Sequence, residues 1–326
     1  MNVHELVDEL FEVFADRIGE PLGEIARDLP RTLALAPAAS VPWSRVFSHE
    51  VTLGAPALFA EAMQELDPTI LRNAVLAHLL AVIDAFGTDR IEDLQIEASP
   101  TLFAVLGQAR RERDRAVGRI FPGGVPAEFD FRAADALTMR AIRSERIALL
   151  SGRSIDLEGY ERAALDKQCA GIVASVALAR AAGWSASRRR TVRLTLESIS
   201  LALQLADDVV DWEDDLRHGG AWAVSLARGL QQPTSGVMRI EGADDPPQSI
   251  RERVLQSGVL VAMLTRAWVH MRRARRRAAA LGARRLATWA ASQEEKLRAL
   301  AAAEAANAGY AVRAKALAAW ACEVLA

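Results

Sequence analysis

The order of hydrophobic and polar residues along the chain is typical of helices. Apolar residues recur at the helical period of about 3.6 residues, and helix-favouring Ala, Leu, Arg and Glu are abundant. The pattern predicts helices at 2–18, 56–66, 69–86, 98–118, 131–151, 157–183, 186–217, 248–281 and 283–325. Proline and glycine separate these segments, and Gly87 and the pair Gly219–Gly220 are expected to end two of them. Because no segment alternates as a strand does, the sequence predicts an all-α fold with one domain over residues 1–326.

One segment, residues 229–250, departs from this pattern. Proline, glycine, serine and glutamine replace the helical periodicity there. A long irregular insert in a helical domain is commonly functional or disordered. We expect this segment to be either a lid over an active site or a disordered connection.

Composition narrows the classes of protein further. The chain has 326 residues, 51% of them hydrophobic, which is enough for one large helical domain. The net charge of -2 and pI near 6.3 argue against a nucleic-acid partner or a general attraction to anionic membranes. Cys169 and Cys322 lack metal-ligand spacing and fit a reducing compartment.

The N-terminal stretch predicts the cellular location. It is amphipathic and acidic, unlike the basic start and apolar core of a signal peptide. No apolar run approaches the roughly 20 residues that cross a bilayer. We therefore expect a cytoplasmic protein without a transmembrane segment.

The most informative segment is 194–220, where aspartates are concentrated on an otherwise apolar helix. If this segment is one continuous helix, five aspartates fall within an arc of about 120°. They are Asp207, Asp208, Asp211, Asp214 and Asp215, and Gln204 lies one turn before them. Stacked like charges repel, and Mg²⁺, which prefers carboxylate oxygens, would resolve this conflict. The apolar residues on the rest of the helix make a solvated acidic face without a ligand the less favoured alternative.

A second acidic group lies upstream, near residue 90. Asp89 and Asp93 are four residues apart, so a continuing helix would present both on one face. Asp84 would point about 140° away from Asp89, and Glu92 is a further carboxylate nearby. Spacing of this kind also occurs by chance, and by itself it is equally consistent with a solvated turn.

These two segments together resemble the class I isoprenoid synthase superfamily, which includes terpene synthases, polyprenyl diphosphate synthases and squalene and phytoene synthases. The motif QLADDVVDWEDDLRHG, residues 204–219, looks like their aspartate-rich motifs, and residues 160–183 are similar to the preceding helix. Lys167 lies near the place of a diphosphate-contacting lysine. The first motif departs from the family pattern, with Thr88 where an aspartate would stand and Gly87 interrupting the helix.

The resemblance implies a helical bundle of the class I terpenoid synthase type with a central apolar cavity and a prenyl diphosphate substrate. It implies that carboxylates from both segments hold Mg²⁺, namely Asp89, Asp93, Asp207, Asp208, Asp211 and Asp215. Of these six residues, the resemblance assigns the catalytic role to Asp211, Asp215, Asp89 and Asp93. Substrate-binding roles fall to Arg140, Arg143, Lys167, Arg217 and Gln204.

Three functions are open at this point. A terpene synthase that ionises and cyclises one diphosphate is favoured over a prenyltransferase, because the first motif is irregular and the usual arginine pair is missing. The prenyltransferase would extend a chain with isopentenyl diphosphate or couple two allylic diphosphates. The third function is noncatalytic binding. Helical surfaces rich in Ala and Leu near the C-terminus would also suit a homodimer.

Overall fold

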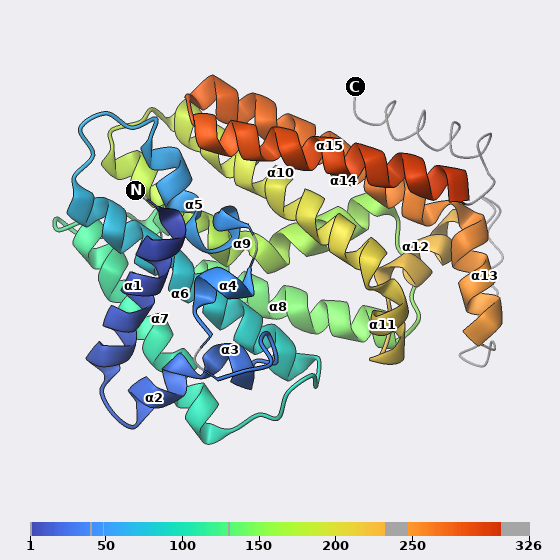
Figure 1. Ribbon diagram of the computed structural model, residues 1–326, viewed down its shortest axis with the longest axis horizontal. Coiled ribbons are helices and arrows are strands. Elements are labelled where there is room, and N and C mark those ends of the chain that lie inside the picture. The colour runs from blue at the N-terminus through green and yellow to red at the C-terminus, as the bar shows by residue number, and fades with distance from the viewer. Residues whose placement is uncertain (1, 40, 48, 130, 232–246, 308–326) are drawn as a thin grey trace. The chain divides into compact units, whose positions relative to one another are not determined.

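The computed structural model describes residues 2–307 apart from 40, 48, 130 and 232–246. Within these residues every regular element is a helix, which confirms the predicted all-α fold (Figure 1). The first half of the chain forms α1 (Val3–Ile18), α2 (Leu22–Arg27), α3 (Leu29–Thr32), α4 (Trp43–Val46), α5 (Glu50–Ala60), α6 (Pro68–Glu92), α7 (Pro100–Ile120), a 3-10 turn (Ala127–Phe129) and α8 (Phe131–Leu150). The second half forms α9 (Leu157–Ala181), α10 (Ala186–Val210), α11 (Trp212–Arg217), α12 (Trp222–Gln231), α13 (Pro247–Ser257), α14 (Val259–Leu281) and α15 (Arg284–Asn307).

The chain forms two compact units, each assembled from separate stretches. Unit 1 comprises residues 1–143, 166–197 and 276–287, and unit 2 comprises 144–165, 198–275 and 288–326. In unit 1, α6 packs against α5 and α7, and α1 packs against α5. In unit 2, α12 packs against α11 and α13. The expectation of a single domain stays a prediction.

Helix α6 is the central element of unit 1 and begins with a strong start signal. The Asp67 side chain accepts a hydrogen bond from the backbone N–H of Thr69, and Pro68 occupies the first turn. The helix is apolar on nearly all sides and is mostly buried between Asn73 and Thr88. Helix α7 starts in the same way, with Ser99 as its cap and Pro100 next.

The prediction that Gly87 ends this helix is wrong, because α6 continues to Glu92. A Cβ at position 87 would lie 2.9 Å from two methyl carbons of Leu106 on α7. The glycine is therefore explained by the close approach of two helices and not by a break in one.

Two other predicted helices differ from the structure, and part of a third lies outside the described residues. The helix expected at 56–66 is α5, which starts earlier and contains a kink at Gly54. The helix expected at 248–281 bends by 49° at Gly258, whose φ of 74° favours glycine. In the last predicted helix, residues 308–325 lie outside the described residues, as do 232–246 of the predicted lid or connection.

Among the described residues, α6 is long and apolar enough by length and composition to cross a membrane, and the bent pair α13–α14 would count as a second span. The sequence expectation of no such apolar run was therefore too strict. In α6, 72% of the apolar stretch is buried inside the structure, and a core helix passes the same test.

Candidate active site

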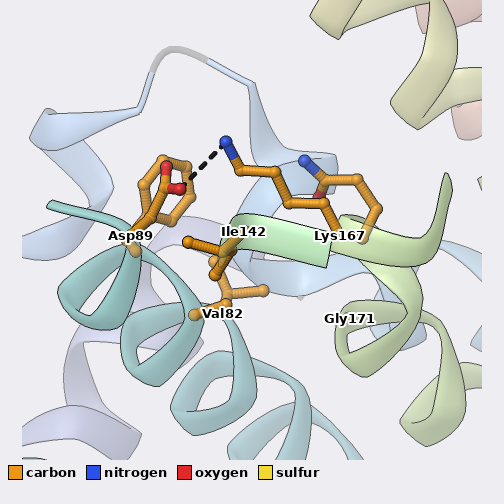
Figure 2. Close-up of a pocket in the computed structure, with 8 residues that line it drawn as sticks. Val82, Asp89, Ile142, Lys167 and Gly171 are labelled. Atoms are coloured by element: carbon orange, nitrogen blue, oxygen red, sulfur yellow. Dashed lines mark ion pairs between the residues drawn. The ribbon is translucent and has the colours of Figure 1, made fainter. Parts of the chain in front are cut away.

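An ion pair between α6 and α9 lies at the mouth of an apolar pocket in unit 1. The Nζ atom of Lys167 is 2.9 Å from Oδ1 of Asp89, and the two side chains are 15% and 21% exposed. Figure 2 shows the ammonium and the carboxylate pointing toward each other, with Val82 and Ile142 close by. The pocket is open to solvent, spans about 390 Å³ including that open space, and is also lined by Ala85, Phe86, Gln168 and Gly171. The sequence had singled out both charged residues independently.

This arrangement suits an amphiphilic ligand with an anionic head. The pocket walls are mainly apolar, whereas its charged groups come from only two residues. An ammonium attracts phosphate oxygens as a point charge, and an apolar wall accepts a hydrocarbon tail.

Asp84, five residues before Asp89 on α6, faces a different set of groups. Its side chain is buried, and Oδ2 accepts a hydrogen bond of 2.7 Å from Nε of Arg110 on α7. Within the described residues its other oxygen, Oδ1, has no hydrogen-bond partner. Burial raises the pKa of this carboxyl, although Arg110 opposes the shift. Asp84 lines a second pocket together with Thr88 and Arg110.

Asp93 ends α6 as its C-terminal cap. Its backbone N–H donates to the carbonyl oxygen of Asp89 at 2.9 Å, so the two residues are linked through the last helical turn. Whether their side chains share a ligand stays a prediction.

The second acidic segment is broken at Asp211, which corrects the prediction of one helix over 186–217. Helix α10 ends at Val210, and Asp211, with φ −103° and ψ 3°, caps α11. Its carbonyl oxygen accepts the backbone N–H groups of Asp214 and Asp215 at 2.8 and 2.9 Å. The five aspartates are therefore divided between the end of one helix and the start of the next. Acidic residues are favourable in a first helical turn, which reduces the conflict expected from stacked charges.

Asp208 is the buried member of this group and is held on both oxygens. Gln204 donates from Nε2 to Oδ1 at 2.9 Å, and the Tyr160 hydroxyl donates to Oδ2 at 2.5 Å. Burial, reinforced by the charge of Asp208, raises the pKa of Tyr160 well above its usual value. The phenol therefore acts as a donor. Tyr160 was part of the recognised motif, but the sequence alone did not indicate that it contacts Asp208.

The residue next to Tyr160 belongs to a buried charge cluster that sequence analysis missed. Glu161 on α9 accepts two hydrogen bonds from Arg266, one from Nε and one of 2.8 Å from Nη2. Its Oε1 also lies 2.9 Å from Nε2 of His270. Burial alone would raise the pKa of Glu161, but hydrogen bonds from Arg266 and His270 outweigh it and lower the pKa to about 2. The available signal was an arginine and a histidine four residues apart, Arg266 and His270, in the first half of α14, where the other residues are mostly apolar.

Of the five aspartates, Asp215 has a pKa that is clearly raised by burial and by neighbouring negative charges. Burial, and then the charges of Asp211 and Asp207, raise its pKa from 3.8 to about 6. A carboxylate in such surroundings is stabilised by a cation.

We expect Asp215→Asn to raise the melting temperature in metal-free buffer at about pH 8, by roughly 1–3 °C after allowing for solvent screening. The folded chain holds this proton more tightly than the unfolded chain, so wild-type stability falls as pH rises from about 4 to about 6 and stays lower above that range. Thermal melts at about pH 4 and pH 8 test this, with Glu213→Gln at an exposed position as the control. A variant that melts below wild type at the higher pH would contradict the prediction.

The remaining predicted site residues are on the surface or paired with nearby acids. Asp207, Asp211 and Arg140 are exposed. Arg143 pairs with Glu92 at 3.1 Å, and Arg217, which is 70% exposed, pairs with Asp214 at 2.8 Å. Substrate-binding roles for Arg140, Arg143, Arg217 and Gln204 stay predictions.

The carboxylates of the described residues supply the donor atoms for the predicted Mg²⁺ site. Within the described residues, no three His, Cys, Asp or Glu side chains are placed to hold a metal ion. The donors nevertheless fit a hard divalent cation, because Asp84 has a buried oxygen without a partner and Asp215 is crowded by like charges. Asp89 belongs to unit 1 and Asp208 to unit 2, and the expectation that both groups bind one metal cluster stays a prediction.

Comparison with known proteins supports the fold. No protein-family model and no curated protein matches the chain. Among solved structures, it is similar to a polyprenyl synthase from Caulobacter crescentus CB15 complexed with calcium and isoprenyl diphosphate, at 21% identity and a TM-score of 0.53, over 89% of this chain and 97% of that one. A polyprenyl synthetase from Streptomyces coelicolor A3(2) matches at 14% identity and a TM-score of 0.64, over 90% and 97% of the two chains.

A third similar structure is the geranylgeranyl pyrophosphate synthetase from the archaeon Geoglobus acetivorans, at 15% identity and a TM-score of 0.57, over 90% of this chain and 98% of that one. The chain thus has the all-α fold of the class I isoprenoid synthases. The likeness confirms the helical fold that the resemblance of the aspartate-rich motif implied.

Proposed function

We propose that the chain is a prenyltransferase that joins an allylic prenyl diphosphate to isopentenyl diphosphate with Mg²⁺ as cofactor. The observation that carries the proposal is the contact between Asp89 and Lys167 at the mouth of an apolar pocket. These residues were selected from separate motifs, 78 positions apart (167 − 89), and they meet in one unit. The likeness of the fold to polyprenyl synthases supports the same reaction class.

The side chains suggest how the substrate is held. The apolar pocket wall takes the prenyl chain and excludes water from it. Lys167 would contact the diphosphate in unit 1, where Asp89 would be a metal ligand. In unit 2, Asp208, Asp211 and Asp215 are the carboxylates that would hold a metal ion. When bound, Mg²⁺ neutralises the charge that develops on the diphosphate as the carbon–oxygen bond breaks.

The chemistry then requires that the electron pair of that bond leave with diphosphate. The double bond of isopentenyl diphosphate attacks the allylic cation, a carbon–carbon bond forms, and the resulting cation loses a proton to the released diphosphate. A site for this reaction keeps water away from the cation, and the apolar residues Val82, Phe86 and Ile142 serve that purpose.

A terpene synthase, the function that the sequence favoured, remains the second candidate. The solved structures of similar fold are polyprenyl synthases and favour the prenyltransferase. One observation supports the cyclase instead. Arg110 and Arg113, which could have bound a second diphosphate, are hydrogen-bonded to Asp84 and Asp135.

The two functions are separated by incubating the purified full chain with Mg²⁺ and geranyl, farnesyl or geranylgeranyl diphosphate, with and without isopentenyl diphosphate. We expect longer prenyl diphosphates to form only when isopentenyl diphosphate is present. Hydrocarbon or alcohol products from the allylic diphosphate alone would support the terpene synthase. Absence of any metal-dependent diphosphate release with all three substrates would reject both and leave a binding function.

A further inference from the structure

Tyr160 occupies a position in unit 2 that the proposed reaction does not explain by itself. The side chain is fully buried, and its ring makes an edge contact with Trp222, with 5.6 Å between ring centroids. The indole Nε1 of Trp222 in turn donates to Oε1 of Glu145 at 2.8 Å. The orientation of the phenol is thus fixed by packing, and its hydroxyl is directed at Asp208.

The backbone that carries Tyr160 is fixed as well. The next residue, Glu161, is bound by Arg266 and His270 from α14. Two adjacent residues of α9 therefore connect to two different helices, Tyr160 to α10 and Glu161 to α14. Because Tyr160 is anchored in this way, its hydroxyl can fix the orientation of a less constrained side chain that it contacts.

Asp208 is the side chain that Tyr160 contacts in this way. A carboxylate in the last turn of a helix has several rotamers, but here Gln204 and Tyr160 hold one oxygen each. Groups that hydrogen-bond a metal-binding carboxylate orient it, and their loss commonly weakens metal affinity by 10- to 100-fold.

We propose that Tyr160 is a positioning residue that, together with Gln204, holds Asp208 in the orientation that binds a metal diphosphate. The inference rests on the proposed function, because it assumes that Asp208 is a metal ligand. It goes beyond that function in assigning the metal affinity of this segment to a buried phenol that does not itself contact the metal.

The test compares wild type with Tyr160→Phe, which removes one hydroxyl and keeps the ring against Trp222. Calorimetry with Mg²⁺ and inorganic diphosphate gives the metal affinity without turnover. We expect the dissociation constant for Mg²⁺ to rise by roughly 10- to 100-fold. We also expect kcat to recover at saturating Mg²⁺, whereas the Mg²⁺ concentration for half-maximal rate stays high.

Trp222→Phe is the matched control for a structural effect, since it removes the bond to Glu145 and keeps an aromatic ring beside Tyr160. This variant should keep the Mg²⁺ affinity within about threefold of wild type. That change is smaller than the roughly 10- to 100-fold decrease expected when a hydrogen bond to a metal ligand is lost. Unchanged metal affinity in Tyr160→Phe would overturn the inference, as would a loss of kcat that no Mg²⁺ concentration restores. If wild type binds no Mg²⁺ with diphosphate, the proposed function fails first, and that result is distinct from the other two.

Discussion

The Asp211→Ala variant should lose roughly 100- to 1,000-fold in kcat for Mg²⁺-dependent turnover of an allylic diphosphate and keep its fold. A loss of this size is usual when one preorganised electrostatic group is removed from an active site. Asp211 is exposed, and its side chain makes no capping hydrogen bond to α11, so the fold does not depend on it. Release of diphosphate and the melting temperature should be measured on the same preparation.

Asp214→Ala is the matched control for this experiment. It removes the same charge three residues further on, from an exposed side chain that pairs with Arg217 and was not assigned to the metal. It should retain turnover within about threefold of wild type, as a surface ion pair contributes little. If Asp211→Ala turns over as fast as this control, the metal-ligand assignment for Asp211 is wrong.

The second large effect concerns stability. Glu161→Gln should destabilise unit 2 by about 3–5 kcal/mol, because it leaves the buried Arg266 guanidinium without its counter-charge. A lower melting temperature by circular dichroism is the expected result. Glu158→Gln, on the exposed side of the same helix, is the control and should change stability little.

The pH dependence of this effect follows from the lowered pKa of Glu161. Its stabilising contribution is complete above the ordinary value of 4.5 and is lost as pH falls toward about 2. The difference in melting temperature between wild type and Glu161→Gln should therefore shrink at about pH 3. A difference that stays constant down to this pH would show that the ion cluster is not its source.

The sequence indicated the fold class because helical periodicity is a local property that tertiary contacts rarely reverse. Even so, two helix ends were predicted wrongly. A helix end was predicted at Gly87, where the helix continues, and a continuous helix was predicted through Asp211, where the helix ends. At Gly87 a local breaker signal was overridden by packing against Leu106. At Asp211 the helix ends although the apolar pattern continues through Trp212 and Leu216.

The site was only partly predictable for a related reason. Asp89, Lys167 and Asp208 stand in motifs with recognisable spacing, and two of them proved to be in contact. The partners of buried charges cannot be read from spacing, because they depend on which helices meet. Glu161 finds Arg266 across 105 residues, and no local pattern indicates that distance.

The narrow space at Gly87 limits how unit 1 can change. Asp84 lies three residues before this glycine on α6, and Arg110 lies four residues after Leu106 on α7. A bulkier residue at 87 would overlap the Leu106 side chain, which would have to shift to make room for it. The size of the residue tolerated at position 87 is therefore coupled to the side chain at position 106.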